Sequence, residues 1–531
     1  MSHNFKYPES LPNSWFSKIS KGIFDQNPEV IAFYPNSGPK ADFEKIIEKK
    51  QSFSVESRQV LVKVLLAQYG NLAQGKVLEN IHKLENRSTF TVTTGQQIHL
   101  GLGPLYVVYK ALSTIQLAKD LESKFPDNSI VPVFWMATED HDFDEIRDVR
   151  VFNRTYTWNQ EHGGPVGRLN TENIAQVFDT IAADFSKDQG LQDILRHFKE
   201  VYPTFTNLAD ATRFLLNELF HEYGLVIIDP DSVQFKKAAI SLFATDLQTD
   251  LFYAGLKQRT ADLKKQGLEI QIGARPCNLF LLDHGKRIRI EKRPNGFALA
   301  ESEQLYSTDV LLEMLQKEPD RFSPNVALRP LYQEVVLPNI AYVGGPGELI
   351  YWFQLEPLFA LANIPAPALI QRHSFIWPDR KSMEILNSDL TKLDFYFKSE
   401  SEFQEHFFQN RIEDSQIVKG VSDFETVSEN INKALYLEKS IHLKEVKKMG
   451  EDYLKLLKNA REAYFNAMKT TGKTAEDWNK HSKVKAKYFS PDSAQEREIH
   501  FLEMKVLHST FPHDLLPLPN LSQSLLWVLC D

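Results

Sequence analysis

The sequence has little cysteine. Only Cys277 and Cys530 occur among 531 residues, and they lie far apart in the chain. Two such cysteines provide neither a disulfide framework nor a zinc cluster. The scarcity of cysteine therefore predicts reduced thiols in an intracellular protein, with no evident zinc site.

Long hydrophobic runs and a strong charge of one sign are also missing. The sequence contains no run of about 18 apolar residues, and residues 1–16 lack the apolar stretch of a secretion signal. The formal net charge is −9, which gives no overall basic field for nucleic acid. We therefore expect a cytoplasmic protein that binds neither a membrane nor nucleic acid.

The residues that are present indicate an α/β fold. Residues 89–94 (TFTVTT) read as a strand that ends in a glycine-rich turn, and Pro104 suits the first position of a following helix. The next strand, residues 130–137, is almost entirely apolar, as parallel strands covered on both faces are. Strand, helix and strand within about 45 residues indicate a βαβ unit. Further strands of this kind are expected at 224–231, 339–348 and 363–375.

The pattern along the chain predicts four parts. An alternating stretch at 268–293, with the turn His284-Gly285-Lys286, indicates an antiparallel insertion in the core. The expected parts are a mainly helical segment at 1–88, a parallel-sheet core at 89–376 with insertions at about 150–222 and 232–322, an antiparallel coiled coil at 377–472, and a C-terminal segment at 473–531 that docks on the core.

The coiled coil is predicted from two apolar seams with steps of three and four residues. Two interpretations are open: two amphipathic helices packed on the core, or a projecting coiled coil that dimerises the protein. The first seam is Met383, Leu386, Leu390, Leu393 and Phe397, and the second is Val446, Met449, Tyr453, Leu456, Ala460, Tyr464 and Ala467.

The turn after the first core strand is the first candidate site. Backbone N–H groups at a strand-to-helix turn stabilise anions together with the helix dipole. The turn is neither a P-loop nor GxGxxG, although His99-x-Gly101 is similar to the HIGH element of class I aminoacyl-tRNA synthetases. The alternative is a tight turn with a surface histidine. The candidate residues are Thr94, Gly95, Gln96 and Gln97.

An acidic stretch after the second core strand is the second candidate. Six acids lie within residues 139–148, at the strand end where open α/β sheets bind ligands. These acids could bind a substrate ammonium group or Mg²⁺ with ATP, and His141 could act as a general base. The alternative is a set of acidic caps for a helix that begins near Phe143. The candidate residues are Glu139, Asp140, His141 and Asp142.

Two further stretches follow later strands. A glycine turn at the end of the 339–348 strand leads into a helix that Glu348 would open, and Arg329 could hold a phosphate or a carboxylate with two hydrogen bonds. Arg372-His373-Ser374 follows the last core strand, where class I synthetases carry a phosphate-binding loop, but the KMSKS sequence is absent. The alternatives are structural turns and a surface ion pair. The candidate residues are Asn325, Arg329, Gly344, Gly345, Gly347, Glu348, Arg372 and Ser374.

Taken together, several motifs resemble one family. The resemblance covers most of the chain and is weakest at residues 1–85 and 398–480. The motifs are TTGQQ…GPLYVVYKA, VPVFWMATEDHDFDEI, GGPVGRL, EYGLVIIDPD, NVALRPLYQEVVLPNIAYVGGPGELIYWFQL and SPDSAQERE, in this order. This set is similar to the BshC family of bacillithiol biosynthesis, the cysteine ligases.

The resemblance implies a fold and a reaction. The fold would be a Rossmann-like core of the nucleotidylyl-transferase type with connecting-peptide insertions, and its coiled coil would form a homodimer. The reaction would join cysteine to glucosaminyl-malate in the last step of bacillithiol synthesis. ATP, together with Mg²⁺, would activate the cysteine carboxylate as an adenylate, and the glucosamine amine would then form the amide.

The resemblance also implies roles for the candidate residues. Asp140, His141 and Asp142 would be catalytic, with His141 as the base for the amine. The remaining candidates would bind substrate or nucleotide around one crevice, and Arg372 and Ser374 would approach the phosphates. Two alternatives remain open: a related adenylate-forming ligase for another amino acid or amine, and a nucleotide-binding coiled-coil scaffold without catalysis.

Overall fold

The computed structural model describes residues 5–9, 11–12, 15–388, 392–409, 426, 443–470, 472–490, 494–508, 510–520 and 523–529. The chain divides into two compact units. The first contains Met1, residues 15–375 and residues 495–527, and the second contains residues 2–14, 376–494 and 528–531. In the described part of the chain, no helix has both the length and the apolar character needed to cross a membrane.

A parallel sheet forms the centre of the first unit. Within the described residues it has five strands in the order β13-β12-β2-β3-β6, and all of its pairs are parallel. The chain first forms β2, β3 and β6, which extend the sheet in one direction. It then forms β12 and β13, which extend the sheet from β2 in the other direction. This is the Rossmann arrangement, with a switch point between β2 and β12. The strands are β2 (Thr89–Gln96), β3 (Ser129–Met136), β6 (Val226–Ile228), β12 (Asn339–Gly344) and β13 (Ala368–Gln371).

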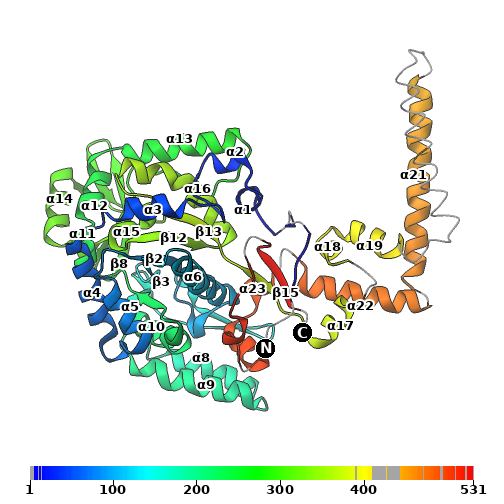
Figure 1. The fold of residues 1–531 in the computed structure, drawn as a ribbon, viewed down its shortest axis with the longest axis horizontal. Helices are drawn as coiled ribbons and strands as arrows, with labels where there is room; N and C mark the ends of the chain where they lie inside the picture. Colours follow the sequence, from blue (N-terminus) through cyan, green and yellow to red (C-terminus); the bar gives the residue numbers. More distant parts are fainter. Residues whose placement is uncertain are drawn as a thin grey trace. The chain divides into compact units, whose positions relative to one another are not determined.

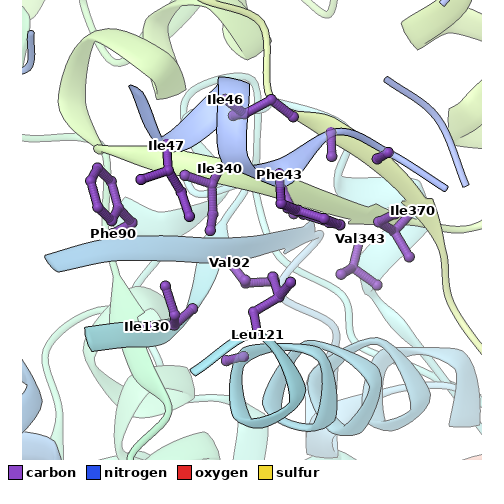
Figure 2. Close-up of a cluster of buried hydrophobic side chains, with 14 residues drawn as sticks. Phe43, Ile46, Ile47, Phe90, Val92, Leu121, Ile130, Ile340, Val343 and Ile370 are labelled. Atoms are coloured by element: carbon purple, nitrogen blue, oxygen red, sulfur yellow. The ribbon is translucent and has the colours of Figure 1, made fainter. Parts of the chain in front are cut away.

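The sheet is buried on both faces. Its strands are rich in Ile, Val and Phe, so each side can exclude water from an apolar layer. Helix α3 (Phe43–Lys50) contributes Phe43 to one face, and α6 (Leu105–Lys124) contributes Leu121 to the other (Figure 2). The α/β prediction and the expected core strands are therefore confirmed. Other helices of this part are α1 (Lys18–Phe24), α2 (Pro28–Ile31), α4 (Val55–Tyr69), α5 (Gly75–Lys83) and α16 (Pro346–Leu361).

Two long insertions interrupt the strand sequence. The second contains an antiparallel sheet of order β10-β9-β8-β7-β11, and its β7–β8 turn lies at His284-Gly285 as expected. The first insertion has α7 (Phe143–Ile146), β4 (Asp148–Val151), β5 (Arg154–Thr157), α8 (Ile174–Asp184), α9 (Gln189–Val201) and α10 (Leu208–Phe220). The second has α11 (Val233–Ala238), α12 (Ile240–Gln248), α13 (Leu251–Lys265), β7 (Leu279–Asp283), β8 (Lys286–Arg293), β9 (Gly296–Leu299), β10 (Leu305–Tyr306), α14 (Thr308–Lys317), β11 (Phe322–Pro324) and α15 (Arg329–Val336).

Residues 495–527 return to the first unit. They include α23 (Gln495–Glu498) and α24 (Phe501–Leu507). The backbone N–H of Leu105 donates to the Ile499 carbonyl (3.1 Å), and that of Phe501 donates to the Gly103 carbonyl (2.9 Å). These bonds attach the C-terminal segment to the start of α6.

The second unit is mainly helical (Figure 1). Residues 473–494 group with it, which differs from the predicted boundary at 473. The physical reason is local packing, because Lys485 donates to the Tyr396 carbonyl (2.7 Å) and Trp478 packs against Phe403. Its elements are β1 (Phe5–Lys6), α17 (Arg380–Leu386), α18 (Leu393–Tyr396), α19 (Glu400–Gln409), α21 (Leu443–Met468) and α22 (Gly472–Tyr488). Two strands, β14 (Ser374–Ile376) and β15 (Leu526–Leu529), lie at the boundaries of the units.

The two predicted seams have different outcomes. The first does not form one helix, because α17 ends at the C-cap Asn387 and α18 begins only at Leu393, while Leu390 lies outside the described residues. The second falls within the continuous helix α21. Its Met449 is 72% exposed and its Leu456 is 64% exposed, so these two side chains remain accessible in the single chain.

Candidate functional site

A pocket lies at the switch point of the central sheet. Its volume is about 320 Å³, and it is called here the central pocket. The ends of β2 and β12 and the loop after β3 contribute to it, as expected for a ligand site of an open α/β sheet. The residues important here are Gly95, Gln96, Gln97, Asp140, Glu145, Arg329, Glu348 and Tyr351.

Asp140 connects the parts of this pocket. One carboxylate oxygen accepts hydrogen bonds from Gln97 Nε2 (3.1 Å) and Arg329 Nη2 (3.0 Å). The other accepts from Arg287 Nη1 (3.3 Å) and from the backbone N–H of His141 (2.9 Å). The Asp140 side chain therefore holds a residue directly after β2 and residues from β8 and α15 around one carboxylate.

These donors also set the charge state of Asp140. Burial alone would raise the pKa of this carboxyl, but Arg329, the His141 hydrogen bond and Arg287 outweigh it and hold the pKa well below its usual range. A carboxylate with so low a pKa is a weak proton acceptor. Asp140 is thus suited to organising charge and geometry rather than to moving a proton.

Lys110 holds the other side of the pocket. Its side chain is 2% exposed and comes from α6. Its Nζ donates to the Gly95 carbonyl (2.6 Å) and to Gln96 Oε1 (2.6 Å), and it forms an ion pair with Glu348. Burial lowers the pKa of Lys110, and the Glu348 carboxylate opposes that shift. Lys110 thus joins the end of β2 to the first turn of α16.

Glu348 begins α16 as predicted. Its carboxylate accepts hydrogen bonds from the Gly345 N–H (2.7 Å) and the Tyr342 hydroxyl (2.8 Å). Gly344 is the last residue of β12 and is buried, whereas Gly347 is partly exposed on the first turn of α16. A Cβ added to Gly347 would meet no protein atom within 4 Å, so this backbone faces open space at the helix start.

Glu145 is a second acid of the central pocket. It lies on the short helix α7 and is exposed to solvent, although protein atoms surround its carboxyl group. Burial of its carboxyl by the surrounding protein, together with the negative charges of Asp142 and Asp140, raises its pKa to about 7. A carboxyl with this pKa exchanges protons readily near neutral pH.

A second, smaller pocket adjoins the central one and is called here the arginine pocket. Its volume is about 220 Å³, and it shares Asp140, Val326 and Arg329 with the central pocket. The predicted residues His141 and Asn325 line it. Asn325 Oδ1 accepts from the backbone N–H groups of Ala327 (2.8 Å) and Leu328 (3.1 Å). Asn325 therefore shapes the loop that leads into α15.

His141 has one ring nitrogen engaged. Its Nδ1 lies 2.8 Å from Arg287 Nη1. Because a guanidinium can only donate, Nδ1 must accept this hydrogen bond. The structure thus places His141 beside the predicted acids, but with the Nδ1 lone pair directed at a cation.

Glu139 lies away from the two pockets. Its side chain is 2% exposed and forms a buried ion pair with Lys236, which also donates to the Phe322 carbonyl (2.6 Å). Burial raises the pKa of Glu139, while Lys236 opposes the shift. Glu139 therefore anchors the loop after β3 to the second insertion. The sequence pattern placed Glu139 at the crevice, but its side chain does not line either pocket.

Arg372 and Ser374 form a structural cluster. Arg372 donates to both carboxylate oxygens of Glu496 (2.8 and 2.7 Å) and to the Ser374 hydroxyl (2.9 Å). The Arg372 and Glu496 side chains are 4% and 7% exposed. The expectation that Arg372 and Ser374 approach a phosphate is not met, because the guanidinium is occupied by a carboxylate from the motif SPDSAQERE.

This buried pair leads to a stability prediction. Replacing Glu496 by alanine leaves the Arg372 charge buried without its partner, and we expect a loss of roughly 3–5 kcal/mol in the free energy of unfolding. Denaturant unfolding measures it. The matched control is Glu313→Ala, which breaks the exposed pair with Lys317 and should cause no measurable loss. Equal stability of the two variants would contradict the assigned role of the pair.

The turn before α6 offers fewer free groups than the sequence pattern predicted. The Leu105 N–H donates to Ile499, so a first-turn donor of this helix is already used. His99 is buried, its Nε2 lies 3.2 Å from the Tyr106 hydroxyl, and burial lowers its pKa to about 3. Thr94 donates its hydroxyl hydrogen bond to the Val343 carbonyl (2.7 Å) between strands. Of this stretch, Gly95, Gln96 and Gln97 remain at the pocket.

Sequence reasoning did not identify three important residues. Lys110 and Glu145 lie within the quoted motifs but were not singled out, and Arg287 lies outside them; Lys110 and Arg287 also pair with residues distant in the sequence. One signal was available for Lys110 and Arg287, since a basic residue predicted on a buried helix face or a buried strand face requires a partner. Glu145 lay within the acidic stretch but was not distinguished from its neighbours.

The family follows from a direct comparison. The family model described as "Bacillithiol biosynthesis BshC, N-terminal Rossmann-like domain" matches residues 3–373. The chain belongs to the BshC family. This confirms the resemblance inferred from the motifs, and the five-stranded parallel sheet agrees with the Rossmann-like description of the domain.

Curated relatives within the BshC family carry the same name. The chain is 38% identical over 392 residues to "Putative cysteine ligase BshC" of Flavobacterium johnsoniae, covering 73% of this chain and 74% of the relative. It is 40% identical over 358 residues to the protein of that name from Cytophaga hutchinsonii, covering 67% and 66%. A relative from Prosthecochloris aestuarii is 33% identical over 384 residues, covering 68% of each chain.

Proposed function

We propose that the protein is an ATP-dependent ligase that joins the carboxyl group of L-cysteine to the amine of glucosaminyl-malate. The observation that carries this proposal is the central pocket at the β2–β12 switch point of a BshC-family domain. The names of the relatives, which describe cysteine ligases, support the choice of amino acid. Because ATP and cysteine are cytoplasmic metabolites, the proposed location of the enzyme is the cytoplasm.

The proposed chemistry has two steps. In the first, a cysteine carboxylate oxygen attacks the α-phosphorus of ATP, forming cysteinyl-adenylate and releasing pyrophosphate. In the second, the neutral glucosamine amine attacks the acyl carbon, the C–N bond forms, and AMP leaves with the bond electrons. The amine loses one proton to a base. Positioning and charge stabilisation are the main contributions of the protein to such a reaction.

The central pocket offers suitable groups for these steps. Gln97 Oε1 is buried and has no hydrogen-bond partner among the described residues, so it can accept from a substrate donor. Arg329 and the start of α16 supply positive potential for a phosphate or a carboxylate. The carboxylate oxygens of Asp140 and Glu348 already accept hydrogen bonds from protein groups. Magnesium would therefore enter with the ATP phosphates and retain waters, rather than occupy a protein cage.

Glu145 is the proposed base for the amine. It lines the central pocket, and its pKa of about 7 leaves a substantial ionised fraction at neutral pH. His141 is the predicted alternative, but its Nδ1 already accepts from Arg287. Asp142 is exposed, and its negative charge contributes to the raised pKa of Glu145.

Isotope exchange tests the adenylate step. Purified protein with ATP, labelled pyrophosphate and cysteine should return label to ATP, and serine or alanine should replace cysteine poorly. Exchange that is equally fast with serine would favour a related adenylate-forming ligase. Release of ADP and phosphate during ligation, with no exchange, would refute the adenylate and replace it with an acyl phosphate.

We also propose that α21 joins two copies of the chain. Met449 and Leu456 are exposed and, with Tyr453, keep the steps of four and three residues of a heptad seam. A second copy provides the same seam, so the two helices can bury each other's apolar side chains. The pattern therefore favours a homodimer over attachment of α21 to the core of its own chain.

Charge placed on this seam should separate the dimer. The double variant Met449→Glu, Leu456→Glu is expected to shift the mass at micromolar concentration from two chains to one, because carboxylates would repel across the interface. Light scattering after size exclusion measures the mass. Lys458→Glu, an exposed change on the same helix, should leave the dimer intact. A wild-type monomer, or a dimer that survives the double change, would contradict the proposal.

A further inference from the structure

The arginine pocket carries more positive charge than its one carboxylate can balance. Four arginines line it: Arg275, Arg287, Arg289 and Arg329. Asp140 is the acid among its lining residues, and it already binds Arg287 and Arg329. The pocket therefore has a net surplus of cationic groups, which a bound anion would balance.

Arg275 and Arg289 supply this surplus. Arg289 has Glu291 as its nearest carboxylate, at 3.7 Å, and both side chains are partly exposed, at 40% and 30%. Arg275 is exposed, and in the described part of the chain its guanidinium makes no ion pair or hydrogen bond. Both guanidiniums can therefore offer parallel N–H groups to a ligand carboxylate.

The antiparallel sheet gives this pocket an apolar floor. Arg287 and Arg289 are two residues apart on β8 and so share one face. Phe280 of β7 lies opposite Arg289 in the strand register, and the Arg287 guanidinium carbon lies 3.8 Å from the centre of the Phe280 ring. The floor thus combines an aromatic surface with charged groups at its edge.

We propose that the arginine pocket binds the dicarboxylate end of the acceptor substrate, with Arg275 and Arg289 holding its two carboxylates. This inference rests on the proposed function, in which the acceptor has a malyl group with two free carboxylates. Because the two pockets share Asp140, Val326 and Arg329, one acceptor can extend from the arginine pocket to the central pocket. Its sugar amine then reaches the reaction site.

The ATP triphosphate fits this pocket less well. The Mg²⁺ ion of a triphosphate complex prefers oxygen ligands such as carboxylates. The carboxylate that lines this pocket is Asp140, and both of its oxygens already accept hydrogen bonds from arginines. The four-carbon malyl chain can instead lie on Phe280 and Val326 with its charges toward the arginines. A small volume of about 220 Å³ also suits a short dicarboxylate.

Acceptor kinetics test the assignment. Arg275→Gln and Arg289→Gln should each raise KM for glucosaminyl-malate about tenfold or more, as expected for a lost charge-assisted pair, and leave KM for ATP and cysteine unchanged. The wild-type preference for this acceptor over methyl glucosaminide, which has no carboxylates, should shrink in both variants. Arg293→Gln, on the same strand but outside the pocket, should retain wild-type values.

Binding of L-malate separates this inference from the ligase reaction. Malate should raise the melting temperature of the wild-type protein and of Arg293→Gln, but not of the other two variants. Malate binding that depends on Arg275 and Arg289 supports the pocket even if no ligation occurs. Unchanged acceptor KM in both variants during active ligation overturns the inference, as does a rise in KM for ATP instead. A wild-type protein that malate does not stabilise at any concentration also overturns it.

Discussion

Glu145→Gln is expected to lower kcat about 10²- to 10⁴-fold, the usual contribution of a general base. The amide retains the size of the side chain but cannot take the proton of the sugar amine. KM for ATP should change little, because the glutamine still fills the same place. Steady-state ligation kinetics measure both values. Asp144→Asn, a neighbouring exposed acid on the same short helix, should retain wild-type kcat.

The pH dependence of kcat tests independently whether Glu145 acts as the base. The pKa of Glu145 is raised to about 7, so its carboxyl is protonated and inactive as a base below that pH. Wild-type kcat should therefore rise as the pH passes upward through about 7, and this step should be missing in Glu145→Gln. A variant that keeps both its rate and the same pH step would exclude Glu145 as the base and return that role to His141.

Asp140→Asn is expected to have the second large effect, a fall of about 10³-fold in kcat/KM. The change removes the charge that holds Arg287 and Arg329 together, and the two guanidiniums then repel. The free energy of unfolding should fall by roughly 3 kcal/mol, as for a broken buried ion pair. Denaturant unfolding and ligation kinetics at a temperature where the variant remains folded measure the two effects separately.

Asp148→Asn is the matched control for Asp140→Asn. Asp148 belongs to the same acidic stretch, but its carboxylate is exposed and accepts from the Thr157 hydroxyl (2.6 Å) on the neighbouring strand. Its replacement should leave kcat/KM unchanged. If Asp140→Asn keeps wild-type activity while it remains folded, Asp140 is not the organising residue of the central pocket.

The core of the fold was predictable because its strands carry a local signal. The strand β3 reads SIVPVFWM, with seven of its eight residues buried, and apolar continuity of this kind is typical of a strand covered on both faces. Helix α6 begins at Leu105 with Pro104 as its N-cap, one residue later than predicted. The order of the strands in the sheet has no such local signal, and the Rossmann arrangement came from the family resemblance.

The candidate site was predictable only in part, because long-range pairing decides which polar side chains remain available. Gln97, Asp140 and Arg329 lie at strand or helix ends and do meet. Arg372 also follows a strand end, yet its guanidinium is paired with the carboxylate of Glu496, which lies 124 positions away in the sequence. Glu139 is similarly occupied by Lys236. A sequence pattern identifies a polar residue at a strand end, but not the partner that neutralises it.

The first coiled-coil seam shows the limit of a short periodic pattern. Steps of three and four residues persist from Met383 to Phe397, but Asn387 ends the first helix. Two short helices can carry apolar residues at the same three- and four-residue spacing as one long helix. The sequence pattern alone therefore does not show the break between them. The second seam spans more turns, and α21 is continuous over its 26 residues.

The most direct test of the central claim is ligation by the purified protein, followed by mass spectrometry of the product. With ATP, L-cysteine and glucosaminyl-malate, the account predicts the amide product, with one AMP and one pyrophosphate per product. Omission of any of the three substrates, or the change Asp140→Asn, should abolish or strongly reduce it. A folded wild-type protein that leaves ATP and both other substrates intact would contradict the account and favour a nucleotide-binding scaffold.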